Sequence, residues 1–100
     1  MPYGYSGTMR TQPGRRDDVV ALLLRDVDEL RPAGCRVYAV ATNDDDEPDL
    51  VYVYEVWDSK AHHADSLQLP SVKAAIAEAM PMLTGEFDGM ELDVVGGLGA

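Results

Sequence analysis

The segment from Leu50 to Trp57, LVYVYEVW, constrains the fold more than any other part of the chain. Its β-branched and aromatic residues are typical of a β-strand. Alternation along a strand divides them into two sides, neither of which is polar: Val51, Val53, Glu55 and Trp57, and Leu50, Tyr52, Tyr54 and Val56. A strand of this kind requires cover on both faces. We therefore expect it to lie within a sheet that is buried from two sides.

Five further segments complete an order of strand, helix, strand, strand, helix, strand. Alternating polarity predicts strands over 3–11, 35–42 and 90–95, and apolar residues at helical spacing predict a helix over 15–30. A second helical region begins after the capping residues Asp58 and Ser59, restarts at Pro70 and bends or ends at Pro81. This order predicts an α+β, ferredoxin-like βαββαβ domain over residues 1–100, with an antiparallel four-stranded sheet and both helices on one face.

The second face of that sheet needs another source of cover. The chain's own helices can cover only one face, and the strand over 50–57 is apolar on both. We therefore predict that the second face is buried against the sheet of an identical partner in a two-fold homodimer.

The charge of the chain argues against partners that are themselves negative. It has 18 acidic and 8 basic residues, a formal net charge of −10 and no Lys/Arg cluster, so we expect neither nucleic acid nor a membrane surface as a partner. Its apolar runs are far shorter than the roughly 20 residues of a membrane-spanning helix. The N-terminal residues show no secretory signal, and we expect a cytoplasmic protein.

Six short motifs, in this order along the chain, resemble those of the antibiotic biosynthesis monooxygenase family, which includes quinol monooxygenases. They are Gln12-Pro13-Gly14-Arg15, Tyr54-Glu55-x-Trp57-x-Ser59, His63 with Ser66-Leu67, Pro70-Ser71-Val72, Ala79-Met80-Pro81 and Val94-Val95-Gly96-Gly97. The resemblance implies a homodimeric α/β barrel that binds a flat, oxidisable aromatic substrate. It also implies that O₂ is used without flavin, haem or metal.

The chemistry that this resemblance implies needs no cofactor. A deprotonated quinol or anthrone can pass an electron to O₂, so the protein need only bind it, promote deprotonation and exclude water. The sequence has no GxGxxG after a strand, no Walker A motif and no His/Cys/carboxylate set at metal-ligand spacing. The single Cys35 can form neither an internal disulfide nor the usual zinc site, and we expect it to be a small buried residue.

Five residues are candidates for the site. His63 is a candidate general base, since imidazole titrates near neutral pH, although a structural histidine is the competing interpretation. Trp57 is expected to pack and also to line the substrate pocket, where its indole could stack on an aromatic ring. Glu55 shares its strand face, and either binds substrate or, as we favour, holds a backbone group or an Arg at the dimer edge. Ser6 and Ser66 are weaker polar candidates for substrate binding.

Two observations limit the functional prediction. Some related domains degrade haem with an Asn on the first strand and a His beyond the third; Gly7 and Leu67 stand near these positions here, which disfavours haem degradation. Two other functions remain open: a non-catalytic dimeric domain that binds a small apolar metabolite, and an isomerase of the muconolactone type on the same barrel.

Overall fold

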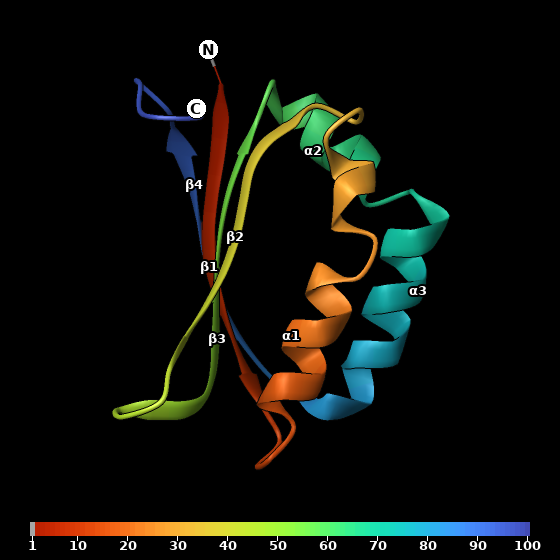
Figure 1. Cartoon of the computed structure of the whole chain (residues 1–100), viewed down its shortest axis with the longest axis vertical. Coiled ribbons are helices and arrows are strands. Elements are labelled where there is room, and N and C mark those ends of the chain that lie inside the picture. Colours follow the sequence, from red (N-terminus) through yellow and green to blue (C-terminus); the bar gives the residue numbers. More distant parts are fainter. Residues whose placement is uncertain (1) are drawn as a thin grey trace.

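The protein folds as a four-stranded antiparallel sheet with all of its helices on one side (Figure 1); the computed structural model describes residues 2–100. The strands are β1 (Tyr3–Thr11), β2 (Cys35–Asn43), β3 (Glu47–Trp57) and β4 (Leu83–Asp93). The helices are α1 (Arg16–Leu24), α2 (Lys60–Ser66) and α3 (Pro70–Ala79), with 3₁₀ turns η1 (Val27–Leu30) and η2 (Met80–Met82). The predicted α+β, ferredoxin-like fold is confirmed.

The strand order is β2-β3-β1-β4, which places β3 and β1 at the centre of the sheet. In the register, Glu55 of β3 lies opposite Tyr5 of β1 on one side and Tyr38 of β2 on the other. Two residues further along β3, Trp57 lies opposite Tyr3 of β1. Residues that are paired in register share a face, so these side chains form two adjacent rows on the helix-covered face.

The core lies between this face and the helices. Val19 of α1 and Val51 of β3 are fully buried, and Trp57 packs with Leu30 and Cys35 in a second cluster at the other end of β3. Cys35 is buried at the start of its strand, as predicted, and burial raises the pKa of its thiol to about 11. A thiol of this kind stays protonated at neutral pH.

The predicted helix over 15–30 is wrong in its second half. α1 ends at Leu24, and Asp26 then adopts a left-handed backbone conformation with φ of 58° before the η1 turn begins. Within α1, Val19 is fully buried whereas Leu24, expected on the apolar face, is 44% exposed. Apolar residues that recur every three or four positions fit a continuous helix and two shorter turns equally well, so the pattern did not reveal the break.

Two strands begin earlier than the sequence predicts. β4 starts at Leu83 rather than residue 90, and β3 starts at Glu47 rather than residue 50. The added part of β4, LTGEFDG, has few strand-forming residues, but β1 pairs with it along most of its length. Tertiary pairing therefore outweighs the weak local propensity. In α2, Ser59 caps the helix by accepting a hydrogen bond from the backbone N–H of His62, as predicted.

The face of the sheet turned away from the helices, here called the outer face, carries large apolar side chains. Tyr54 of β3 is 41% exposed and Met90 of β4 is 61% exposed, and both are paired with Ser6 of β1. The segment after β4 packs on part of this face, where Val94 is buried beside Gly4. None of the helices within residues 2–100 has the length and apolar character to cross a bilayer.

Candidate functional site

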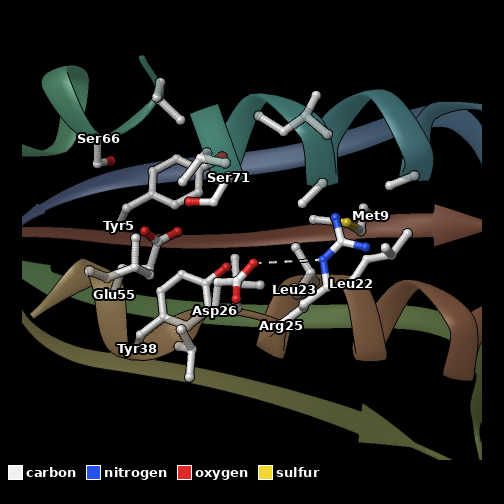
Figure 2. Close-up of a pocket in the computed structure, with 18 of the residues that line it drawn as sticks. Tyr5, Met9, Leu22, Leu23, Arg25, Asp26, Tyr38, Glu55, Ser66 and Ser71 are labelled. Atoms are coloured by element: carbon white, nitrogen blue, oxygen red, sulfur yellow. Dashed lines mark ion pairs between the residues drawn. The ribbon is translucent and has the colours of Figure 1, made fainter. Parts of the chain in front are cut away.

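A cavity of about 420 Å³ lies between the helix-covered face of the sheet and the α1, η1 and α3 segments. Figure 2 shows Tyr5, Tyr38, Glu55 and Ser66 toward one end of the cavity, away from Leu22, Leu23 and Met9. Three further polar side chains line other parts of it: Arg25, Asp26 and Ser71. Trp57 and His63 line it as well. A cavity of this volume with a few polar groups on apolar walls is typical of a small-molecule site.

Glu55 is a buried carboxylate at the polar end. It is 8% exposed, and its Oε1 accepts a hydrogen bond of 3.0 Å from the indole N–H of Trp57, two residues along the same strand. The sequence analysis favoured a backbone group or an Arg at the dimer edge as the partner of Glu55; within this chain the hydrogen-bond donor is the Trp57 indole. Burial raises the pKa of Glu55, and the indole hydrogen bond opposes this shift only in part.

His63 projects from α2 into a group of aromatic rings. Its ring centre lies 5.3 Å from that of Tyr3, 5.8 Å from that of Tyr5 and 5.6 Å from that of Trp57. Burial lowers the pKa of His63, while the negative charge of Glu91 acts in the opposite direction. The environment thus favours a neutral imidazole, which is the form that accepts a proton.

His63 and Glu55 face each other across a gap. The Nε2 atom of His63 lies 3.8 Å from the Oε1 atom of Glu55, too far for a direct hydrogen bond. A ligand hydroxyl about 2.8 Å from Nε2 of His63 could donate its one proton there, and the Glu55 carboxylate is near enough to stabilise the imidazolium that results. The pair can therefore bind a hydroxyl group and accept its proton within a largely apolar cavity.

The two serines differ in their placement. Ser66 lines the cavity, but its Oγ donates a hydrogen bond of 2.6 Å to the carbonyl oxygen of His63. Its hydroxyl proton is therefore already used within α2. Ser6 does not line the cavity, because it lies on the outer face between Tyr5 and Gly7. The structure brings Glu55, Trp57, His63 and Ser66 together and leaves Ser6 apart from them.

The sequence analysis missed two tyrosines that line the cavity, Tyr5 and Tyr38. Burial strongly raises the pKa of Tyr38, so its hydroxyl remains a hydrogen-bond donor at neutral pH. The pairing register, which places both tyrosines opposite Glu55, is the signal that could have identified them. Within residues 2–100, no three His, Cys, Asp or Glu side chains gather as a metal site would require.

Comparison with known proteins gives a consistent result for sequence and structure. The sequence profile of the family described as antibiotic biosynthesis monooxygenase matches residues 2–78. A solved structure of a candidate antibiotic biosynthesis monooxygenase from Chloroflexus aurantiacus J-10-fl is 40% identical, with a TM-score of 0.86, and the match covers 98% of this chain and 97% of that one. No curated protein gives a significant sequence match.

More distant solved structures share the fold. Rv0793 from Mycobacterium tuberculosis is 18% identical with a TM-score of 0.80, over 97% of this chain and 98% of that one. A protein from Caulobacter crescentus CB15, also a candidate antibiotic biosynthesis monooxygenase, is 23% identical with a TM-score of 0.83, over 95% and 91% of the two chains. With a family profile that spans more than half of its residues, this chain belongs to the antibiotic biosynthesis monooxygenase family.

Proposed function

We propose that the protein is a cytoplasmic, cofactor-independent monooxygenase that oxidises a small quinol or polyketide-type aromatic with O₂. Membership of the family supports a monooxygenase-type function in general terms. The observation that carries the specific proposal is the facing pair of Glu55 and His63 at the polar end of an apolar cavity. This pair offers a place for an acidic hydroxyl and an acceptor for its proton.

In this mechanism the substrate hydroxyl donates its hydrogen bond to Nε2 of His63, and the nearby Glu55 carboxylate stabilises the imidazolium that forms. Neutral His63 accepts the proton at Nε2, and the indole N–H of Trp57 holds the Glu55 carboxylate in place. The quinol anion then passes an electron to O₂, and a carbon–oxygen bond forms between the two radicals. Overall, quinol and O₂ give hydroxyquinone and water, so the substrate supplies every electron and one oxygen atom leaves as water.

We propose further that two chains pair through their outer faces. Tyr54 and Met90 are large apolar residues exposed there, and the helices within residues 2–100 lie on the other side of the sheet. Exposed apolar residues of this kind are typical of protein interfaces. A two-fold arrangement would bury the same residues of both chains, and each chain would keep its own cavity on the far side.

Oxygen uptake tests the proposed activity. Metal-stripped protein is mixed with freshly reduced naphthoquinols and anthrones, and uptake is corrected for spontaneous oxidation. Isotopically labelled O₂ should place one labelled oxygen in the product. His63→Gln should lower kcat by about 100-fold or more, and the neighbouring, exposed His62→Gln should leave it unchanged.

Three results would count against the proposal. The absence of uptake above the background across the panel would favour a binding domain, and product formed equally well without O₂ would favour an isomerase. Full turnover by His63→Gln, with the fold intact, would remove His63 from the mechanism.

A further inference from the structure

The end of the cavity opposite Glu55 and His63 has no role in the proposed chemistry. Its walls are formed by α1, α3, η2 and the strands β1 and β4. They carry large apolar side chains: Met9, Leu22, Leu23, Ile76, Met80 and Phe87. Figure 2 shows Met9, Leu22 and Leu23 together, well separated from Tyr5, Glu55 and Ser66. This end of the cavity is thus mainly apolar, with the guanidinium of Arg25 beside these side chains.

Three of these apolar side chains are exposed although they line a cavity. Ile76 is 46% exposed, Met80 is 52% exposed and Phe87 is 55% exposed. They come from three consecutive elements, α3, η2 and β4. Apolar groups that gather around one opening and stay in contact with water are typical of a surface that a hydrophobic ligand covers.

The volume of the cavity exceeds what an aromatic nucleus needs. Since a water molecule takes up about 30 Å³ in the liquid, a cavity of 420 Å³ would hold roughly fourteen water molecules. A naphthoquinol nucleus has about a dozen non-hydrogen atoms. Because bonded atoms lie closer together than neighbouring water molecules, the nucleus takes up less volume than the cavity offers. A ring system held at Glu55 and His63 would therefore leave much of the apolar end empty. An occupant that fills both ends is longer than the ring system alone.

The charges at the rim restrict the chemistry of this extension. Figure 2 shows the Arg25 guanidinium beside Leu22, Leu23 and Met9. Its Nε atom lies 3.9 Å from a carboxylate oxygen of Asp26, and it also forms an ion pair with Glu78 of α3. Its charge is already balanced by these carboxylates. A ligand carboxylate near this position would compete with two existing ion pairs, so an uncharged extension fits the site better.

We infer that the substrate is an amphipathic aromatic compound whose hydroxylated ring lies between Glu55 and His63 and whose uncharged hydrocarbon chain extends along Leu23, Ile76 and Phe87. This inference deepens the proposed function and rests on it for the position of the ring. The chain is the specificity element, because its burial adds affinity without touching the reacting atoms.

Binding of a homologous ligand series tests the inference without turnover. Trp57 is the only tryptophan of the chain and lines the cavity, so its fluorescence reports on ligands bound there. The probes are 2-alkyl-1,4-naphthoquinols, kept reduced by the exclusion of O₂, with unbranched chains from methyl to octyl, and calorimetry provides a second reading. Kd should fall by about two- to fourfold for each methylene that is buried, and then level off when the apolar end is full.

A matched pair of variants locates the chain. Ile76→Asp places a charge at the apolar end and should abolish the dependence on chain length, with Kd for the methyl compound kept within about twofold. Leu24→Asp is the control, because Leu24 is 44% exposed on α1 and does not line the cavity. Phe87→Ser on β4 repeats the test from another element, and circular dichroism verifies that each variant is folded.

The outcomes separate the two proposals. Kd values that do not change with chain length, or that change equally in Ile76→Asp and the wild type, would overturn the inference even if quinols are oxidised. Chain-dependent binding that Ile76→Asp abolishes would support it. The absence of oxygen uptake with the same quinols, once O₂ is admitted, would then count against the oxygenase alone.

Discussion

Gly7 and Gly89 lie directly opposite each other on β1 and β4, and the ring of Tyr5 occupies the space that their side chains would fill. A Cβ atom at Gly7 would lie 2.8 Å from Cε1 of Tyr5, and one at Gly89 would lie 3.0 Å from Cζ and closer still to the hydroxyl oxygen. Tyr5 in turn stacks on His63, with 18° between the ring planes. Because these two glycines have no side chains, they leave room for the Tyr5 ring, which contacts His63, the candidate base.

Gly89→Ala should displace Tyr5 and destabilise the protein by about 1 kcal/mol, the lower end of the range for overpacking. Tyr5→Phe removes the oxygen atom that the new methyl group meets, so the double variant should recover part of the loss. Urea denaturation of the two single variants and the double variant measures this coupling. Gly96→Ala is the control, since a Cβ atom there meets nothing within 4 Å. Strictly additive effects of the two changes would show that Tyr5 does not lie against Gly89.

The buried carboxylate of Glu55 should make the stability of the protein depend on pH. Because burial raises the pKa of Glu55 above its ordinary value of about 4.5, the folded state holds this proton more tightly than the unfolded state. Its contribution to stability is therefore fully present below pH 4.5 and is lost as the pH rises through the folded pKa. Glu55→Gln keeps an acceptor for the Trp57 indole and carries no charge, so it should be more stable than the wild type at pH 8 by about 1 kcal/mol.

Urea denaturation at pH 4.5 and pH 8 measures this difference, which should shrink toward the lower pH. Glu91→Gln is a control of opposite sign, because Lys60 lowers the pKa of Glu91 and the charged form is favoured in the fold. That variant should gain nothing at pH 8. The same advantage for Glu55→Gln at both pH values would contradict the assignment of the effect to a buried charge.

The general features of the fold were predictable because each depends on local pattern. The apolar strand at 50–57, the cap at Ser59 and the breaks at Pro70 and Pro81 all act over a few residues. The break at Asp26 and the early start of β4 were not predictable in this way. A left-handed Asp costs little and leaves no clear mark in the sequence, and residues 83–89 form a strand because β1 pairs with them.

The candidate site was predictable only within one strand. Glu55 and Trp57 share a face by alternation, so their proximity follows from the sequence alone. Tyr5 and Tyr38 reach the same place through strand pairing, and the apolar walls come from helices that are far apart along the chain. Ser6 is the neighbour of Tyr5 on β1, and alternation along the strand places its side chain on the outer face, away from the cavity.

The activity should fall at low pH with a midpoint below the ordinary histidine pKa of about 6.5. Burial lowers the pKa of His63, so the imidazole remains neutral, and able to accept a proton, to a lower pH than a free histidine. The charge of Glu91 raises this pKa, and Glu91→Gln should move the midpoint of kcat/KM further down. Asp88→Asn removes a charge from the outer face of the same strand and should leave the midpoint in place. A midpoint above 6.5, or one that does not move in Glu91→Gln, would argue for another proton acceptor.

If two chains pair through their outer faces, a charged residue introduced on the outer face should weaken the dimer, whereas one introduced on the helix side should not. Tyr54→Lys should give a monomer at micromolar concentration in light scattering, because a two-fold interface would bury the new charge twice. Burial of an unpaired ion costs several kcal/mol, which corresponds to a dimer dissociation constant at least about 100-fold higher. Leu24→Lys is the matched control, with 44% exposure against 41% for Tyr54, and it lies on α1, on the other side of the sheet. A wild-type monomer, or equal effects of the two lysines, would show that something other than a second copy covers Tyr54.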